Sequence, residues 1–137
     1  MSKIVKFNAK NVLGQEFTVM DSFKNVKKVN LGITAILNAI DDYEAKQNKA
    51  KKPVTLMDYQ DIVATQVIKQ TGKLLGLSKE DTEKLEDMSY SEVFKFYSDV
   101  ADKFLDMDIP DPSAIKKGIQ SMNEAAEKQD PKQGVDK

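Results

Sequence analysis

Near the N-terminus, two short runs alternate between apolar and polar side chains, a pattern typical of β-strands. Val5 and Phe7 fall on one face of the run Lys3–Asn8, and the run Glu16–Met20 alternates in the same way. Between the runs, Gly14 is suited to a positive backbone φ angle. Because a two-stranded hairpin is only marginally stable by itself, we expect it to pack on other elements.

Apolar residues then recur at every third or fourth position, which is typical of a helix with one buried face. This stripe comprises Val29, Ile33, Ile36, Leu37, Ile40 and Tyr43. The pattern ends in the lysine-rich run Lys46–Lys52, which Pro53 follows. We therefore expect a mobile loop between helices at Lys46–Lys52.

Three later segments place a hydroxyl side chain three residues before a carboxylate, a pattern typical of the first turn of a helix. The pairs are Thr55 with Asp58, Ser78 with Asp81, and Ser89 with Glu92. We expect the first of these helices to end near Gly76 and the second near Met88. The third carries the clearest apolar stripe, formed by Tyr90, Val93, Phe94, Tyr97, Val100, Ala101, Phe104 and Leu105.

Two prolines in the segment Ile109–Pro112 interrupt the helical pattern, because proline cannot continue the backbone hydrogen bonds of a helix. Ser113 is placed to cap a final helix. The apolar seam of this helix comprises Ile115, Ile119 and Met122. The residues that follow are almost entirely polar, so we expect a flexible end.

These elements predict a mainly α protein of the α+β type. A small N-terminal β-hairpin packs on a bundle of three to five helices, within a chain of 137 residues that has the usual size of one domain. Residues 1–112 form this single domain. Residues 113–137 form a C-terminal helix and a flexible polar tail.

Three residue types that carry much of protein chemistry are missing: the chain contains no Cys, no His and no Arg. The absence of Cys excludes disulfides, thiolate nucleophiles and sulfur-ligated zinc. The absence of His removes the usual acid–base catalyst near neutral pH. The acidic run Asp106–Asp111 lacks the inner Gly and the final Glu of a calcium loop. We expect no enzymatic activity, no cofactor and no metal, and an enzyme built from carboxylates and lysine stays the open alternative.

The net charge of −1 gives no general attraction to nucleic acid or to anionic lipid. No stretch approaches the roughly 20 apolar residues that span a bilayer. Three of the first ten residues are lysines, where a secretory signal has its apolar run. We therefore expect a cytoplasmic protein that binds neither nucleic acid nor membranes.

Charge is unevenly distributed along the chain. Residues 1–52 contain 10 Lys and 5 acidic residues, whereas residues 53–112 contain 6 Lys and 13 acidic residues. The basic first part and the acidic middle are complementary, either within one molecule or head to tail between molecules. The sequence leaves self-association open.

Two apolar surfaces are candidates for binding another protein. The first is the aromatic side of the helix that Ser89 caps, formed by Phe94, Tyr97 and Phe104. An aromatic stripe of this kind is more often core than contact surface. The second is the seam of Ile115, Ile119 and Met122. Its helix has little apolar surface of its own, so it gains order by docking on this chain or on a partner.

In its layout the chain resembles the tail assembly chaperones of long-tailed bacteriophages that infect low-GC Gram-positive bacteria. The resemblance is carried by the β-runs Lys3–Asn8 and Glu16–Met20, the apolar segment Ile33–Ile40, the aromatic segment Ser89–Leu105 and the lysine-rich end Glu127–Lys137. It extends over most of the chain without a diagnostic motif.

The resemblance implies a non-enzymatic chaperone in the cytoplasm of the bacterial host. Such a protein keeps the phage tape-measure protein soluble and assists assembly of the tail tube around it. The tape-measure and tail-tube proteins are the partners that the resemblance implies, and many members also exist in a longer, frameshifted form. A small regulatory or adaptor protein that binds a single host protein is the alternative.

Overall fold

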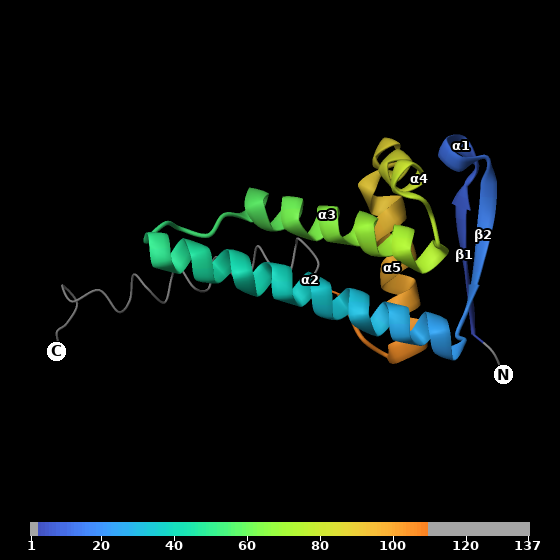
Figure 1. Ribbon diagram of the computed structural model, residues 1–137, viewed down its shortest axis with the longest axis horizontal. Helices are drawn as coiled ribbons and strands as arrows, with labels where there is room; N and C mark the ends of the chain where they lie inside the picture. The colour runs from blue at the N-terminus through green and yellow to red at the C-terminus, as the bar shows by residue number, and fades with distance from the viewer. Residues whose placement is uncertain (1–2, 110–137) are drawn as a thin grey trace.

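A computed structural model describes residues 3–109 of the chain (Figure 1). An antiparallel hairpin of β1 (Ile4–Ala9) and β2 (Gln15–Met20) precedes the main helices. The helical elements are α1 (Lys10–Leu13), α2 (Phe23–Ala50), α3 (Leu56–Leu75), α4 (Lys79–Lys84), the 3-10 turn η1 (Leu85–Asp87) and α5 (Tyr90–Leu105). The prediction of a mainly α protein with a small N-terminal hairpin packed on helices is confirmed.

The hairpin follows the alternating pattern of the sequence. Val5, Phe7 and Ala9 of β1 are buried, and Phe7 pairs with Phe17 in the register of the two strands. The short helix α1 forms the connection, and Gly14 ends it with a φ of 76°, as expected. The ring of Phe7 lies 4.6 Å from the ring of Phe96 in α5, which attaches the hairpin to the helices.

Each of the three predicted helix starts is confirmed by a capping hydrogen bond. The hydroxyls of Thr55, Ser78 and Ser89 accept from the backbone N–H groups three residues later, at Asp58, Asp81 and Glu92. Gly76 ends α3 with a φ of 70°, and η1 ends the second predicted helix just before Met88.

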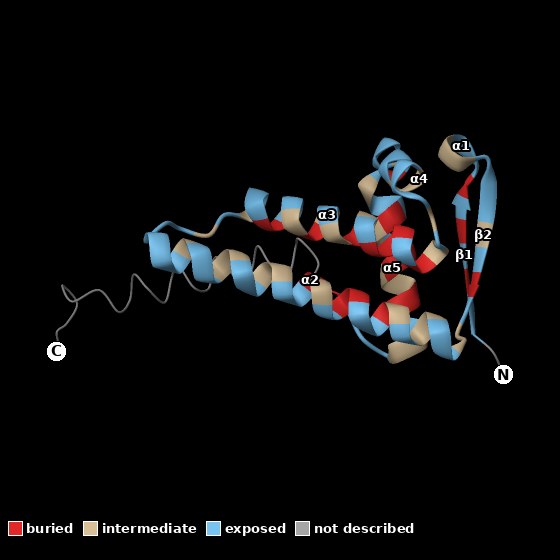
Figure 2. Cartoon of the chain, viewed as in Figure 1, coloured by how far each residue is buried: buried red, intermediate tan, exposed pale blue. Residues whose placement is uncertain are grey.

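The core lies at one end of the molecule, where α5 crosses the paired helices α2 and α3 on one side and contacts β1 on another. Figure 2 shows that the buried residues gather there. Gly32 of α2 faces Tyr97 of α5 and Gln70 of α3. A methyl group at Gly32 would collide with the Tyr97 hydroxyl and would lie 3.2 Å from Cβ of Gln70. The three helices therefore meet closely because this residue has no side chain.

Beyond the core, α2 and α3 continue side by side as an extended arm (Figure 1). Polar contacts of two tyrosines hold the arm together. The Tyr43 hydroxyl donates to Oδ2 of Asp58 at 2.7 Å and accepts from the Thr55 backbone N–H at 3.0 Å. The Tyr59 hydroxyl donates to Oε2 of Glu44. The two rings make an edge-on contact, with their centroids 5.3 Å apart.

The prediction of a loop at Lys46–Lys52 was wrong for most of that run. Helix α2 continues to Ala50, and Lys51 ends it with a φ of 58°. Lys, Gln and Ala are good helix formers even where no face is apolar. The side chain of Gln47 also donates to the Pro53 carbonyl at 2.8 Å, which ties the last turn to the chain that follows.

Leu37 was expected in the buried stripe of α2, but its side chain is 44% exposed. It follows the buried Ile36 by one position, so its side chain points to another side of the helix, whereas Ile40 further along still packs against the core. No helix of the described part of the chain is long and apolar enough to cross a membrane. The expected final helix at Ser113, with the tail that follows it, lies outside the described residues.

We predict that the substitution Gly32→Ala destabilises the protein. Overpacking a core costs about 1–3 kcal/mol, and the collision with the Tyr97 hydroxyl places this substitution in the upper part of that range, about 2–3 kcal/mol. The better helix propensity of Ala offsets about 1 kcal/mol of this. The expected net loss in the free energy of unfolding is about 1–2 kcal/mol, measured by urea denaturation.

Removing the colliding oxygen should restore part of that stability. The loss in the free energy of unfolding of the double variant Gly32→Ala with Tyr97→Phe is therefore expected to be smaller than the sum of the losses of the two single variants. Asn38→Ala, at an exposed position of the same helix, is the control and should change stability by less than about 0.5 kcal/mol. A Gly32→Ala protein as stable as the parent contradicts the packing described here.

Candidate protein-binding groove

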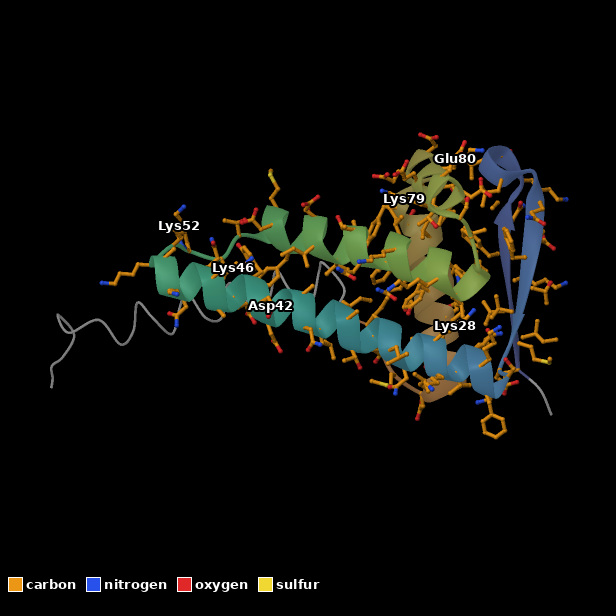
Figure 3. All side chains as sticks on the ribbon, in the orientation of Figure 1. Lys28, Asp42, Lys46, Lys52, Lys79 and Glu80 are labelled. Carbon is orange, nitrogen blue, oxygen red and sulfur yellow. The ribbon has the colours of Figure 1, made fainter. Side chains whose placement is uncertain are left out.

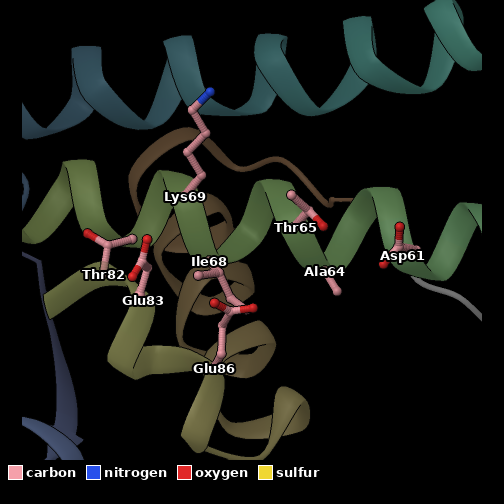
Figure 4. Close-up of a pocket in the computed structure, with 8 residues that line it drawn as sticks. All are labelled: Asp61, Ala64, Thr65, Ile68, Lys69, Thr82, Glu83 and Glu86. Atoms are coloured by element: carbon pink, nitrogen blue, oxygen red, sulfur yellow. The ribbon is translucent and has the colours of Figure 1, made fainter. Parts of the chain in front are cut away.

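Two adjoining hollows lie along the outer side of α3, and Figure 4 shows the residues that line the first of them. The first, of about 240 Å³, is lined by Asp61, Ala64, Thr65, Ile68, Lys69, Thr82, Glu83 and Glu86. The second, of about 460 Å³, is lined by Met57, Gln60, Asp61, Ala64 and Tyr90. Because Asp61 and Ala64 line both hollows, the two form one continuous depression, which we call the α3 groove.

The α3 groove has an apolar floor along one side of the helix. Met57, Ala64 and Ile68 lie at the spacing of one or two helical turns, so their side chains follow one line. From Met57 to Lys69 the helix rises about 18 Å, or three turns. Met57 is 77% exposed, although an apolar side chain gains free energy on burial. A groove of this length and character accommodates one face of a partner helix.

The rim of the α3 groove is acidic. Asp61, Glu83 and Glu86 line it, and none of the three makes an ion pair within residues 3–109. The one basic residue of the lining, Lys69, extends away from Glu83 and Glu86 (Figure 4). The groove therefore favours a ligand that carries positive charge beside its apolar face.

A close contact between α3 and α4 sets the width of the groove. Gly72 faces Thr82, and a methyl group at Gly72 would lie 2.6 Å from Cγ2 of Thr82. Thr82 is held in turn by its hydroxyl, which donates to the Ser78 carbonyl at 2.8 Å. The glycine lets α4 and η1 approach α3, and this places Glu83 and Glu86 along the groove.

Figure 3 shows that both signs of charge occur at each end of the molecule. Lys46 and Lys52 lie towards the far end of the arm with Asp42 nearby on α2, whereas Lys79 and Glu80 lie close together on α4 at the core end. Lys28 lies at the core end too, but on α2. The acidic surface near the α3 groove is therefore distant from the lysine-rich tip of the arm.

The residues that the sequence marked as contact surface are placed differently. Tyr97 is 1% exposed and belongs to the core, while Phe94 and Phe104 are half-buried and pack against it. The ring of Phe94 lies 5.4 Å from the ring of Tyr90, so it supports one wall of the α3 groove. The remaining candidates, Ile115, Ile119 and Met122, lie outside the described residues.

Sequence reasoning missed the α3 groove because its floor is a second, weaker stripe on α3. The main stripe of Tyr59, Val63 and Val67 faces the core. Ala64 and Ile68 follow the last two of these residues by one position and form a narrower line beside them. The four-residue spacing of Ala64 and Ile68 was the available signal, and Thr65 and Asp61 obscured it.

The carboxylates of this region serve hydrogen bonds and surface charge. Among residues 3–109, no group of three or more Asp or Glu side chains is placed to hold a metal ion.

In the arm, Glu44 accepts the hydrogen bond of the Tyr59 hydroxyl, whose ring is buried. Burial, followed by the hydrogen bond and negative charge of Glu44, raises the pKa of Tyr59 above its ordinary value. Burial alone raises the pKa of Tyr97.

Comparison of the chain with protein families, with curated proteins and with solved structures found no match. The α3 groove is thus identified by the geometry and chemistry of this chain.

The raised pKa of Tyr59 predicts a pH dependence of stability. The folded protein keeps the phenolic proton to higher pH than the unfolded chain, whose tyrosines ionise near pH 10. The stability that the protonated Tyr59 contributes is therefore fully present below about pH 10 and is lost as the pH rises further. Urea denaturation over about pH 8 to 11 measures it.

The substitution Tyr59→Phe should lower the free energy of unfolding at neutral pH by about 1 kcal/mol, because one hydrogen bond is lost. Above about pH 10 its stability should fall less steeply than that of the parent protein. Equal slopes in the two proteins would show that Tyr59 does not hold its proton in this way.

Proposed function

We propose that this protein is a non-enzymatic chaperone of a bacteriophage, which keeps the tape-measure protein soluble and assists assembly of the tail tube. It acts in the cytoplasm of the bacterial host, and it binds helical segments of the tape-measure protein in the α3 groove. The observation that carries the proposal is the α3 groove itself, with its apolar floor and acidic rim.

The dimensions of the groove suit a helical ligand. Three turns of α3 border it, and a partner helix of the same length presents two or three apolar side chains at i, i+3 or i+4 and i+7. A long tape-measure chain rich in apolar helices aggregates when those faces meet water. Covering one such face at a time in a shallow groove gives a contact that is released when the tube assembles.

The charge of the groove adds selectivity. Asp61, Glu83 and Glu86 attract lysine or arginine residues that flank the apolar face of a helix, and they repel acidic helices. The arm helps because its tyrosine hydrogen bonds hold α2 and α3 together beyond the core. This keeps the first turns of α3, including the exposed Met57, in place for binding.

Co-expression with the tape-measure protein tests the proposal. We expect the soluble fraction of the tape-measure protein to rise and the two proteins to co-purify. The substitution Met57→Asp should weaken the complex about tenfold or more, because a methionine side chain contributes about 1.5–3 kcal/mol when buried. Met57 is exposed, so the isolated variant should fold normally.

Met107→Asp is the matched control, because Met107 is an exposed methionine that does not line the α3 groove. It should bind like the parent protein. A tape-measure protein that stays insoluble, or equal weakening by both variants, contradicts the proposal. Recovery of one host protein in place of phage tail proteins would support the adaptor alternative.

A further inference from the structure

A second exposed apolar surface lies at the start of α2, away from the α3 groove. The side chain of Phe23 is 99% exposed, although an aromatic ring is among the most favourable side chains to bury. Ile4 and Met20, which are cross-strand partners at the end of the hairpin, are 49% and 47% exposed. We call Ile4, Met20 and Phe23 the Phe23 patch.

The Phe23 patch is surrounded by positive charge. Lys24 and Lys27 follow Phe23 on α2 and are exposed, and Lys6 lies next to the hairpin partners on the outer face of β1. None of these lysines makes an ion pair within the described chain. The neighbouring acid, Asp21, already accepts a hydrogen bond from the Lys3 backbone N–H at 3.0 Å.

The patch and the α3 groove are complementary, yet one molecule does not bring them together. The patch lies where β2 passes into α2, whereas the groove lies on the side of α3 that faces α4 (Figure 1). Helix α3 packs between α2 and α4, so its own body separates the two surfaces. The complementary surfaces can meet only between two copies.

We propose that Phe23 of one copy inserts into the α3 groove of a second copy, in a head-to-tail contact. The hollow beside Ile68 has a volume of about 240 Å³ and is open to solvent, and Ala64 and Ile68 supply apolar contacts for an inserted ring. Glu83 and Glu86 line this hollow, and the proposed contact pairs them with Lys24 and Lys27, which follow Phe23 on α2. Apolar burial anchors the contact, and the opposite charges fix its orientation.

The contact joins two different surfaces, so a dimer keeps one free groove at one end and one free patch at the other. Such a heterologous contact adds further copies and forms chains unless the rotation between copies closes a ring. Because the groove is also the proposed site for a tape-measure helix, the two ligands compete. Self-association occurs without any partner, however, so it is tested on the isolated protein and stands apart from tape-measure binding.

Sedimentation velocity over a series of concentrations up to about 1 mM tests the contact. The parent protein should gain mean mass with concentration, and less so at high salt. The substitution Phe23→Asp removes the patch, and Glu83→Lys with Glu86→Lys reverses the rim. All three positions are exposed, so both variants should fold, which circular dichroism verifies. For each variant alone, the dissociation constant of self-association should be about tenfold or more higher than for the parent protein.

Mixing the two variants gives the decisive result. The Phe23→Asp protein keeps an intact groove, and the rim variant keeps an intact patch. An equimolar mixture should therefore form a one-to-one dimer that does not grow further. Met107→Asp, outside both surfaces, should associate like the parent protein.

A parent protein that stays monomeric at every concentration overturns the proposal. So does a mixture in which both variants remain monomeric, or a Phe23→Asp protein that associates as the parent does. Failure of tape-measure capture leaves each of these outcomes unchanged, because no tape-measure protein is present.

Discussion

The close approach of α2 and α5 at Gly32 determines how the rest of the molecule is arranged. The Tyr97 hydroxyl occupies the space that any side chain at this position would fill, and Cβ of Gln70 in α3 would lie only 3.2 Å from an added methyl group. This allows α5 to contact α2, α3 and β1 together, with the Phe7 and Phe96 rings joining hairpin and helices. A single glycine thus concentrates the core at one end of a long helical pair.

The position of the core explains which surfaces stay open. Helix α5 covers one side of α2 and α3, and α4 with η1 covers only the part of α3 near Gly72. The outer side of α3 between these contacts has no covering element, which leaves the α3 groove. The arm extends past the core, so its stability depends on hydrogen bonds such as that between Tyr43 and Asp58. A helical pair that is packed into a core at one end and leaves one side of α3 uncovered suits the proposed role in binding helical partners.

Local signals in the sequence predicted local structure well. Gly14 and Gly76 adopt positive φ angles, and the three hydroxyl–carboxylate pairs begin helices, because each depends on a few neighbouring residues. The hydrophobic pattern gave wrong predictions where the packing of distant elements determines the structure. Lysine-rich residues up to Ala50 remain helical, and Leu37 is exposed because it follows the buried Ile36 by one position and so points to another side of α2.

The candidate surfaces show the same limit. The sequence offered Phe94, Tyr97 and Phe104 as one candidate surface, although such a stripe is more often core, and Tyr97 is buried in the core. Phe23 was not considered, although it lies four residues before Lys27 and seven before Asn30, on the polar side of α2. An aromatic residue on a polar helix face is the more informative sign of a binding surface, because the core does not account for it.

Amide hydrogen exchange of the protein, alone and in complex with the tape-measure protein, tests the central claim most directly. The account predicts slower exchange in the complex at residues 57–69 and 82–90, which border the α3 groove, with little change on the β1–β2 hairpin. Unchanged exchange along α3, with protection confined to other parts of the chain, would contradict the assignment of this groove as the protein-binding site.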